Sequence, residues 1–443
     1  MGHSKRNGSV EARQAVGVSG RPFLQIPGPT NVPDRILRAM DRPVVDHRGP
    51  EFAALTQAIL PGLRRVFGTR DGAPVIYPAS GTGAWEAALV NVLAPGERVL
   101  AFDHGHFSAQ FAQTARDLGF EVDLVPLRWG QEVPPEAVEA RLGAHGQYRA
   151  VLVVHNETST GVTSDVGAIR QAIDAAGHDA LLIVDGVSSL GSIEFQFDAW
   201  RVDVALCGSQ KGLMLPPGLG IVCVSPRAQQ VAERGGAPRH FFDWRPILRD
   251  NAAGFFPYTP ATLLLFGLRE ALEMLVEEEG LQAVYARHRR LADGVRAAVG
   301  AWDLGILCER AACYSNALTA VVMPDGIDGD AVIRRARERF ALSLGVGLGR
   351  LKGRIVRIGH LGALNELEVL GTLGGVELTL RERGVPLTLG AGLAACQRRF
   401  VEETSPSGSL SAPESVNVSQ NRAASGSAAA IPGLQRVAGA PSA

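Results

Sequence analysis

Residues 204–220, VALCGSQKGLMLPPGLG, place a single lysine, Lys211, between two apolar runs. Two apolar runs joined by a polar triplet and a Pro-Pro-Gly loop are typical of buried strands connected by a turn. Lysine is rare here, because the 44 basic residues include only two others, Lys5 and Lys352, which leaves 41 arginines (44 − 3). Arginine keeps its proton in proteins and cannot act as an amine nucleophile. Since Lys5 lies in a polar tail and Lys352 among like charges, Lys211 is the strongest candidate for lysine chemistry.

Similar apolar runs recur upstream and predict a mainly parallel sheet. Between about residues 70 and 225, short runs rich in Val and Ile alternate with helical stretches; these runs are APVIYPAS, RVLAFDH, EVDLVPL, AVLVVHNE, ALLIVDGV, VDVALCG and GIVCVSP. Continuous apolar runs separated by helices favour an α/β architecture with helices on both faces of the sheet. Ligands bind at the carboxyl ends of such strands. Those ends carry the polar groups Ser80, Asp103, His155 to Thr158, Asp185 and Ser209 to Lys211.

The sequence divides into four predicted segments. We interpret residues 1–22 as a flexible arm and residues 23–284 as the large domain. A helical pattern from about residue 258 leads into a smaller α+β domain, predicted over residues 285–401. Residues 402–443 are low in aromatic residues and rich in Ser, Ala and Gly, which predicts a disordered tail.

Composition excludes several classes of protein. A net charge of −1 disfavours a nucleic-acid partner, which would need a basic face. No apolar run approaches the roughly 18 residues of a membrane span, and the N-terminus lacks the apolar stretch of a secretory signal, so we expect a cytoplasmic protein without a membrane partner. The five cysteines form no CxxC pair and are odd in number, so neither a disulfide framework nor a zinc or other metal site is indicated.

Asp185 and Lys211 form the first candidate site. Asp185 ends the apolar run of LLIVDGVSSLG, where a buried carboxylate needs a cationic or hydrogen-bonding partner. Lys211 follows another strand 26 residues later, so neighbouring strands would bring an acid and an amine into one crevice. One interpretation is a structural salt bridge. The other is a pyridoxal phosphate site, in which the lysine forms a Schiff base and the acid keeps the pyridine nitrogen protonated.

A phosphate-bearing cofactor also needs an anion site, and YPASGTGAWEAALVNVL offers one. This stretch predicts a strand, a turn of small residues from Ser80 to Gly83, and a helix. The backbone N–H groups at the helix start, with the Ser80 and Thr82 hydroxyls, could bind phosphate. The same turn is also typical of an ordinary N-cap. The sequence has no GxxxxGK[ST] motif, so a nucleoside triphosphate site is not supported.

Seven motifs together resemble the class V aminotransferases of the type I pyridoxal phosphate fold, and among them the serine-glyoxylate and alanine-glyoxylate members. They are ASGTGAWEAAL, VVHNETSTGV, LIVDGVSSLGS, CGSQKGLMLPPGLG, FFDW, YTPAT and RIGHLG. The resemblance covers about residues 23 to 395. It implies a large domain with a mainly parallel seven-stranded sheet, a smaller α+β C-terminal domain, and pyridoxal 5′-phosphate as cofactor.

The resemblance also implies roles at the cofactor. Lys211 matches the Schiff-base lysine and Asp185 the partner of the pyridine nitrogen. Phe107 matches the aromatic residue that stacks on the ring, where alanine-glyoxylate members have tryptophan, so a phosphate contact by an indole N–H is in doubt. The other implied cofactor contacts are Ser80, Gly81 and Thr82 in the phosphate loop, Gln210 beside the lysine, Thr158 near the ring hydroxyl, and Val187 under the ring.

Three further residues are implied to act on the substrate or across a dimer. Arg357 in RIGHLG matches the arginine that binds the substrate α-carboxylate, a task for which its two-donor fork is suited. Tyr258 and Thr259 match a segment that reaches the phosphate site of a neighbouring subunit, which implies a homodimer or a dimer of dimers. Without the resemblance, Tyr258 and Thr259 would be interpreted as a simple turn before a helix.

These residues predict a ping-pong transamination of small amino acids and 2-oxo acids. We expect L-serine and glyoxylate to give hydroxypyruvate and glycine, with L-alanine as the alternative donor, through Lys211 as Schiff base and general base. Cysteine desulfuration on the same fold is disfavoured, because no cysteine lies in a loop suited to a mobile nucleophile. A non-catalytic scaffold is disfavoured by the presence of Lys211, Asp185 and Arg357.

Overall fold

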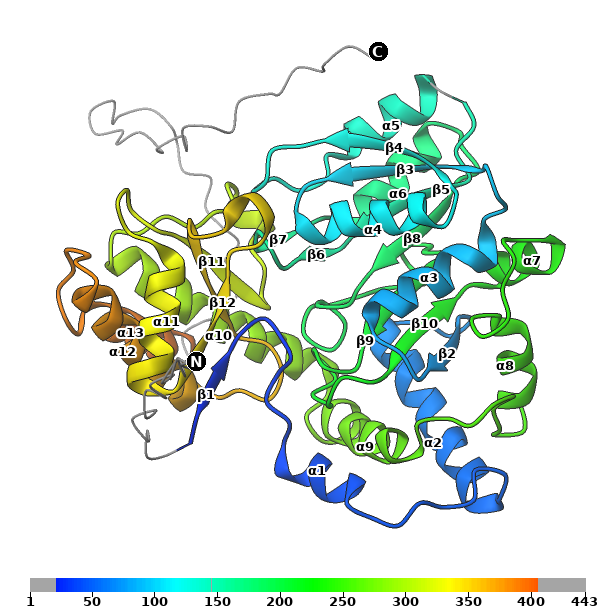
Figure 1. The fold of residues 1–443 in the computed structure, drawn as a ribbon, viewed down its shortest axis with the longest axis horizontal. Coiled ribbons are helices and arrows are strands. Elements are labelled where there is room, and N and C mark those ends of the chain that lie inside the picture. The colour runs from blue at the N-terminus through cyan, green and yellow to red at the C-terminus, as the bar shows by residue number, and fades with distance from the viewer. Residues whose placement is uncertain (1–20, 145, 405–443) are drawn as a thin grey trace, which may run out of the picture.

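A seven-stranded sheet forms the centre of the computed structural model, which describes residues 21–144 and 146–404. Its strand order is β2-β10-β9-β8-β5-β3-β4 (Figure 1). All neighbours from β9 to β4 are parallel, whereas β10 is antiparallel to both β2 and β9. The predicted α/β class with a mainly parallel seven-stranded sheet is confirmed. The strands are β2 (Ala73–Tyr77), β3 (Arg98–Asp103), β4 (Glu121–Pro126), β5 (Ala150–Val154), β8 (Leu181–Asp185), β9 (Val204–Gly208) and β10 (Gly220–Val224).

Helices cover both faces of this sheet, as the continuous apolar runs predicted. Within β8, Leu182 and Val184 belong to one apolar core, and Leu181 and Ile183 to a second core on the other face. The first core includes side chains of α2 (Pro50–Phe67), α5 (Pro135–Ala144), α6 (Val166–Ala175) and α9 (Thr262–Leu272). The second includes side chains of α3 (Gly81–Val92), α4 (His106–Asp117), α7 (Pro226–Arg234) and α8 (Trp244–Asn251).

A smaller four-stranded sheet lies beside the large one, in the order β1-β12-β13-β11 (Figure 1). Strand β1 is parallel to β12, while β13 is antiparallel to β12 and β11. The described residues therefore begin in the smaller sheet, and the chain then crosses to the larger unit. The elements of this unit are β1 (Phe23–Gln25), α10 (Leu281–Ala301), β11 (Leu318–Val322), α11 (Gly329–Phe340), β12 (Leu342–Val346), β13 (Ile355–Gly359), α12 (Glu366–Glu382) and α13 (Ala391–Thr404).

The predicted domain limits at residues 22, 284 and 401 remain a prediction. The segment assigned to the large domain opens with β1, which pairs with β12 of the smaller sheet. Helix α13 continues to Thr404, so it includes the first residues of the predicted tail. The predicted arm up to residue 20 and the tail from residue 405 lie outside the described residues.

Short elements connect the larger ones. Helix α9 leads into a π-helical turn, Glu273–Glu278, and Gly280, with φ of 80°, separates that turn from α10. The remaining elements are α1 (Asp34–Met40), the two-stranded ribbon of β6 (Asn156–Glu157) and β7 (Val162–Thr163), and the 3₁₀ turns Ala311–Cys313 and Gly349–Leu351. Within the described ranges, no helix combines the length and apolarity needed to cross a membrane.

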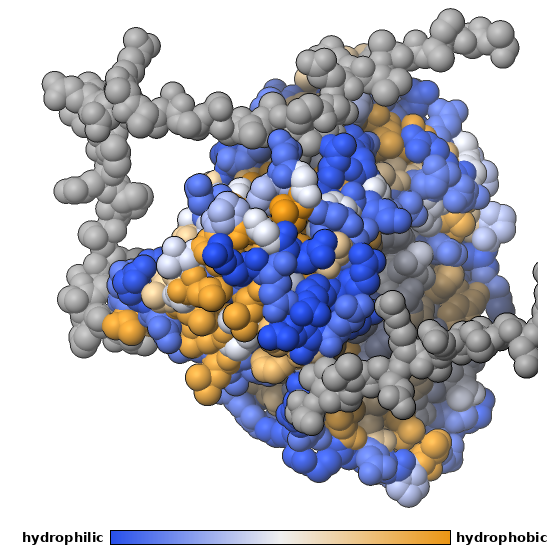
Figure 2. All heavy atoms as spheres, turned by 60° about the vertical axis from the view of Figure 1, so that its left-hand side comes forward, coloured by the Kyte–Doolittle hydropathy of each residue, from blue (hydrophilic) through white to orange (hydrophobic). Residues whose placement is uncertain are grey.

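Figure 2 turns the helices of the smaller unit toward the viewer. Hydrophobic side chains lie there between hydrophilic ones, and α12 exposes Leu367 and Leu378. Apolar atoms make up much of any folded protein's surface, so these side chains identify no partner.

Candidate active site

Lys211 follows the end of β9, where the polar triplet leaves the sheet. Its Nζ donates a hydrogen bond of 2.6 Å to the carbonyl oxygen of Pro27. Partial burial lowers the pKa of Lys211 to about 8; the positive charge of Arg357 lowers it further, and Asp185 opposes the shift. A lysine with such a pKa carries a substantial neutral fraction near pH 8, as a nucleophile or general base requires.

The N-terminal segment after β1 packs directly on this lysine. A Cβ on Gly28, whose φ is +90°, would lie 2.4 Å from Lys211 Cδ and 2.6 Å from Nζ. Thr30 also donates through Oγ1 to the Lys211 carbonyl at 3.1 Å. A glycine is therefore required at position 28 for both conformation and space. Sequence reasoning missed Pro27 and Gly28, because their proximity to Lys211 depends on contacts some 180 residues apart.

Asp185 ends β8 and is buried, as predicted. Its Oδ2 accepts a hydrogen bond from Trp85 Nε1 at 2.8 Å, and its Oδ1 accepts one from the Val187 N–H at 2.7 Å. Burial raises the pKa of Asp185 to about 6, although both hydrogen bonds and Lys211 lower it. Over the described residues no ion pair joins Asp185 to Lys211, whose Nζ instead bonds to Pro27. A structural salt bridge therefore does not account for this acid and amine.

The predicted phosphate turn starts α3. Ser80 is the N-cap, and its Oγ accepts a hydrogen bond from the Gly83 N–H at 3.4 Å, so the turn also serves as an ordinary cap. A Cβ on Gly208 would lie 2.8 Å from Gln210 Oε1 and 3.5 Å from the Gly81 nitrogen. The end of β9 thus brings Gln210 next to the first N–H groups of α3. Thr82, also in the first turn, is exposed.

The side chains expected around a cofactor ring lie at the ends of neighbouring elements. Val187 follows β8 and Phe107 is in the first turn of α4, and both are partly buried against the same apolar core. A Cβ on Gly81 would lie 2.8 Å from Val187 Cγ2, so Val187 packs against the start of α3. Thr158 is buried in the loop after β6.

Arg357 comes from β13 of the smaller sheet and is buried, as its apolar flanks predicted. Its Nε donates to the Val346 carbonyl at 2.7 Å, and its Nη1 donates to the Thr158 carbonyl at 2.7 Å. Burial lowers the pKa of Arg357 to about 10, and the carboxylate of Glu157 opposes this shift. The guanidinium thereby joins the smaller sheet to the Thr158 loop of the larger unit and remains charged at neutral pH.

Tyr258 and Thr259 lie in the segment between α8 and α9. The Tyr258 ring stacks on Phe241, with ring centroids 4.7 Å apart. Its hydroxyl is buried and, over residues 21–144 and 146–404, has no hydrogen-bond partner. Thr259 is exposed. Within the described residues, no hydrogen bond or ion pair joins this pair to Lys211.

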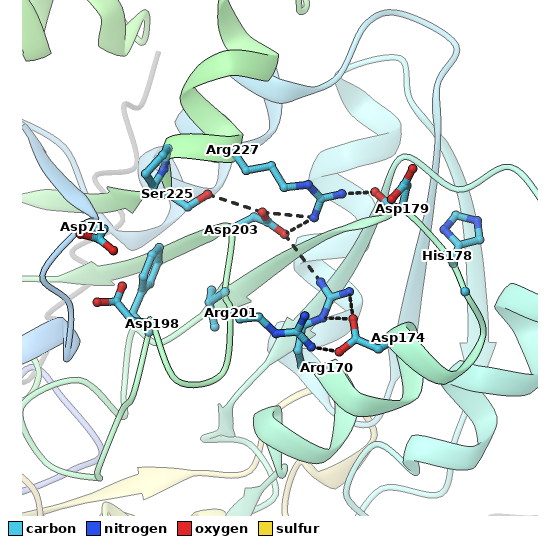
Figure 3. Close-up of a pocket in the computed structure, with 14 residues that line it drawn as sticks. Asp71, Arg170, Asp174, His178, Asp179, Asp198, Arg201, Asp203, Ser225 and Arg227 are labelled. Atoms are coloured by element: carbon cyan, nitrogen blue, oxygen red, sulfur yellow. Dashed lines mark hydrogen bonds and ion pairs between the residues drawn. The ribbon is translucent and has the colours of Figure 1, made fainter.

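A cavity of about 760 Å³ lies at the opposite edge of the sheet, at the amino ends of β8 and β9. Figure 3 shows its arginines directed at aspartates: Arg227 donates to Asp203 at 3.1 Å, and Arg170 and Arg201 both pair with Asp174. Because these arginines are already paired, and ligands bind at the other end of parallel strands, we interpret this network as structural. In the described part of the chain no group of His, Cys, Asp and Glu is arranged to hold a metal ion.

The sheet, the strand-end lysine and acid, and the anion site at a helix start define the class of pyridoxal phosphate-dependent enzymes of fold type I. The family model described as Aminotransferase class-V matches residues 23–339. The chain belongs to this family, and it is a pyridoxal phosphate-dependent aminotransferase.

Relatives match over most of the chain. A serine–glyoxylate aminotransferase of Methylorubrum extorquens is 48% identical over 383 residues, which are 85% of this chain and 95% of the relative. An L-aspartate–glyoxylate aminotransferase of Paracoccus denitrificans is 43% identical, covering 86% of this chain and 96% of the relative. Among solved structures, a pyridoxamine–pyruvate aminotransferase of Mesorhizobium loti aligns with a TM-score of 0.81 and 28% identity, covering 87% of this chain and 98% of that one.

The residues present fit pyridoxal phosphate. Gln210 lies near the first N–H groups of α3, which suit a phosphate, and its amide Nε2 would add a further donor there. Glycine at positions 81 and 208 lets Val187 and Gln210 approach the start of α3, because a Cβ on Gly81 would lie 2.8 Å from Val187 and one on Gly208 2.8 Å from Gln210. Asp185 supplies a buried acid for a ring nitrogen.

Proposed function

We propose that this aminotransferase transfers the amino group of L-serine to glyoxylate, giving hydroxypyruvate and glycine in a ping-pong reaction. The observation that carries the proposal is that the charges of Asp185 and Arg357 both act on the pKa of Lys211. This combination supplies a proton carrier, an acid for the cofactor ring and a cation for a carboxylate. Serine and glyoxylate are taken from relatives that are 44–48% identical and named serine–glyoxylate aminotransferases.

Each residue has a separate task in this proposal. Bound pyridoxal phosphate supplies a carbonyl that exchanges amino groups and a ring that accepts electrons from the substrate. Asp185 holds the ring nitrogen in its protonated form. Lys211 would take the proton from the Cα of the amino donor and, in the reverse half-reaction, would give a proton to the carbonyl carbon of the 2-oxo acid as it becomes an amino acid. Its lowered pKa favours both roles. Arg357 binds the substrate carboxylate with the N–H groups that its backbone bonds leave available.

The remaining contacts hold the cofactor in place. The phosphate would bind Ser80, Gly81 and Thr82 with Gln210 as a further donor. Phe107 and Val187 would enclose the two faces of the ring, and Thr158 would bond its hydroxyl side. Phenylalanine stacks as a planar ring but has no N–H to donate, so we expect the phosphate to depend on the α3 turn.

We propose that the active unit is a homodimer or a dimer of dimers. The Tyr258 hydroxyl is buried and has no hydrogen-bond partner among the described residues, which supports a role toward a second subunit, since buried hydroxyls normally find a partner. In a dimer, Tyr258 and the exposed Thr259 would donate to the phosphate held by the neighbouring subunit. We place this reaction in the cytoplasm.

The buried cysteines argue against cysteine desulfuration as the reaction. All five are buried, and burial raises the pKa of Cys308 to about 11 and of Cys313 to about 12. A thiol with such a pKa is a poor nucleophile near neutral pH.

A donor panel tests the proposed function. The holoenzyme would be assayed with glyoxylate as acceptor and L-serine, L-alanine or L-aspartate as donor, and glycine formation would be measured for each. We expect serine to give the highest kcat/KM. A higher value for alanine or aspartate would overturn the serine assignment, and failure of all three donors would overturn glyoxylate transamination.

A further inference from the structure

Glu157 carries a fully buried carboxylate that sequence reasoning gave no role. It ends β6, immediately before Thr158, and its side chain is 0% exposed. Its Oε2 accepts a hydrogen bond from the Ser108 N–H at 2.8 Å. Its Oε1 accepts from the Phe107 N–H at 3.4 Å, from the Ser159 N–H at 3.0 Å and from the Ser159 hydroxyl at 2.7 Å. Four donors therefore compensate for removing this charge from water.

Two of these donors belong to the first turn of α4, so Glu157 acts as its cap from outside the helix. The N-cap residue Gly105 has no side chain with which to cap. A Cβ at Gly105 would lie 2.2 Å from Glu157 Cγ and 2.3 Å from Cδ. Since φ of Gly105 is 174°, extended backbone that any residue adopts, glycine is needed here for space. The missing side chain leaves room for the carboxylate to reach the helix.

Ser159 adds to the contacts between Glu157 and the start of α4. Its hydroxyl donates to Glu157 and accepts a hydrogen bond from the His106 N–H at 2.9 Å. Three consecutive N–H groups at the start of α4, those of His106, Phe107 and Ser108, are thus held by the end of β6 and the loop that follows it. An acid is also favoured there by the helix dipole.

The backbone of the loop after β6 also binds Arg357. The Thr158 carbonyl, adjacent to Glu157, accepts a hydrogen bond from Arg357 Nη1 at 2.7 Å. The carboxylate also acts on two of the charged groups of the site, since it raises the pKa of Arg357 and of Asp185. The same short loop therefore connects to the proposed ring-stacking residue and to the proposed carboxylate-binding residue.

We propose that Glu157 is a positioning residue, which holds the first turn of α4, and with it Phe107, against the loop that seats the Arg357 guanidinium. It fixes the distance between the place for the cofactor ring and the place for the substrate carboxylate. The inference rests on the proposed function for the roles of Phe107 and Arg357.

The test compares Glu157→Gln with the wild type. Glutamine keeps the shape of the side chain and one acceptor oxygen, but it lacks the negative charge of the carboxylate. Its amide N–H₂ would also face a backbone N–H, so that two donors would meet. We expect the Kd of pyridoxal phosphate for the cofactor-free protein to rise about tenfold or more, as the loss of charged hydrogen bonds implies. We also expect a weaker circular dichroism band of the bound cofactor, which reports how the ring is held, and a higher KM for the amino donor.

Asp328→Asn is the matched control. Asp328 caps α11 in the smaller unit, where its side chain accepts a hydrogen bond from the Asp330 N–H at 3.0 Å. The same change from carboxylate to amide should leave cofactor affinity and dichroism unchanged.

A purely structural role predicts a different result. If Glu157→Gln lowers Tm while the Kd and the dichroism band stay at wild-type values, the proposal is wrong. Should Glu157→Gln fail to fold, Ser159→Ala decides, since it removes only one donor of the cluster and the acceptor for His106. We expect a severalfold rise in Kd for Ser159→Ala, and an unchanged Kd would overturn the proposal. Both readouts are independent of the amino donor, so an error in the serine assignment would leave them valid.

Discussion

At the scale of single residues, Lys211 illustrates how burial and charge prepare a side chain for chemistry. Removal from water and the nearby guanidinium both favour the neutral amine, and the Asp185 carboxylate only partly opposes them. The Pro27 carbonyl meanwhile accepts from Nζ and fixes the direction of the amine. Strand-end position and rarity identified this lysine in the sequence, whereas its hydrogen-bond partner required the folded chain.

Replacing Lys211 should remove the activity and leave the fold intact. We expect kcat of Lys211→Ala to fall by about 10²–10⁴-fold or more, as for loss of a general base. Borohydride should fix the cofactor to the Lys211 peptide of the wild type and to no peptide of the variant, as measured by mass spectrometry. Lys352→Ala serves as the control and should behave as wild type. Wild-type turnover by Lys211→Ala would refute the assignment.

Asp185 should make the cofactor-free protein less stable as pH rises from about 4 to 6. Its pKa in the folded state, about 6, lies above the ordinary value of 3.8, so the folded protein binds more protons in this window. The contribution of Asp185 to stability is therefore fully present below about pH 4 and is lost as pH rises toward the folded pKa. Relative to Asp185→Asn, the wild type should lose about 1–3 kcal/mol of unfolding free energy over this window.

Urea unfolding of both cofactor-free proteins at several pH values measures this difference. Two parallel pH profiles would show that Asp185 titrates at its ordinary pKa in the fold.

At the scale of elements, the start of α3 joins the proposed phosphate site to the acid. Ser80 caps the helix, and Trp85, one turn further on, donates to Asp185. The sequence predicted the strand, the turn and the helix from apolar pattern and small residues. It did not reveal Trp85 as a partner of Asp185, because that contact joins residues 100 positions apart. Likewise, the helical pattern predicted from about residue 258 is interrupted at Gly280. The φ of 80° at this glycine separates the π-helical turn Glu273–Glu278 from α10.

Gly81→Ala should weaken cofactor binding through a steric effect. The new Cβ would lie 2.8 Å from Val187 Cγ2, so either Val187 or the first turn of α3 must move. We expect the Kd of pyridoxal phosphate to rise about tenfold, in line with the cost of overpacking. Titration of the cofactor-free protein by absorbance measures this value.

Gly300→Ala provides the contrast, because nothing lies within 4 Å of a Cβ at this exposed position near the end of α10. There we expect unchanged affinity and a stability gain of about 0.4–1 kcal/mol. Equal affinities in the two variants would show that Val187 does not constrain the cofactor site.

At the scale of the whole molecule, the site lies between two units that local sequence patterns identify separately. Runs of Val and Ile predicted the large sheet, and Arg357 was expected in a buried strand of the second unit. The pairing of β1 with β12 was not predicted, since a three-residue strand has no distinctive pattern and its partner lies more than 300 residues away. The Thr158 carbonyl bond to Arg357 likewise depends on how the two units pack.

If Tyr258 serves the neighbouring subunit, two inactive variants should complement each other. Lys211→Ala and Tyr258→Ala would be unfolded, mixed in equal amounts and refolded, at a cofactor concentration where each alone is inactive. Half of the dimers would then combine one subunit of each kind. In such a dimer one site carries both changes and the other carries neither, so roughly a quarter of wild-type activity should return. Absence of recovery, with heterodimers verified by mass, would place Tyr258 in the site of its own subunit.

The pairing of β1 with β12 also has a consequence for biosynthesis. During translation, Pro27 and Gly28 leave the ribosome early, but the strand that anchors β1 begins only at Leu342. The large sheet can form on the nascent chain before then, because its strands end at Val224. The strand pairing that anchors the segment before this acceptor can form only after most of the described residues have emerged. Assembly of the active site is therefore a late, long-range step, and we expect chains that stop before β12 to form the large sheet without a competent lysine.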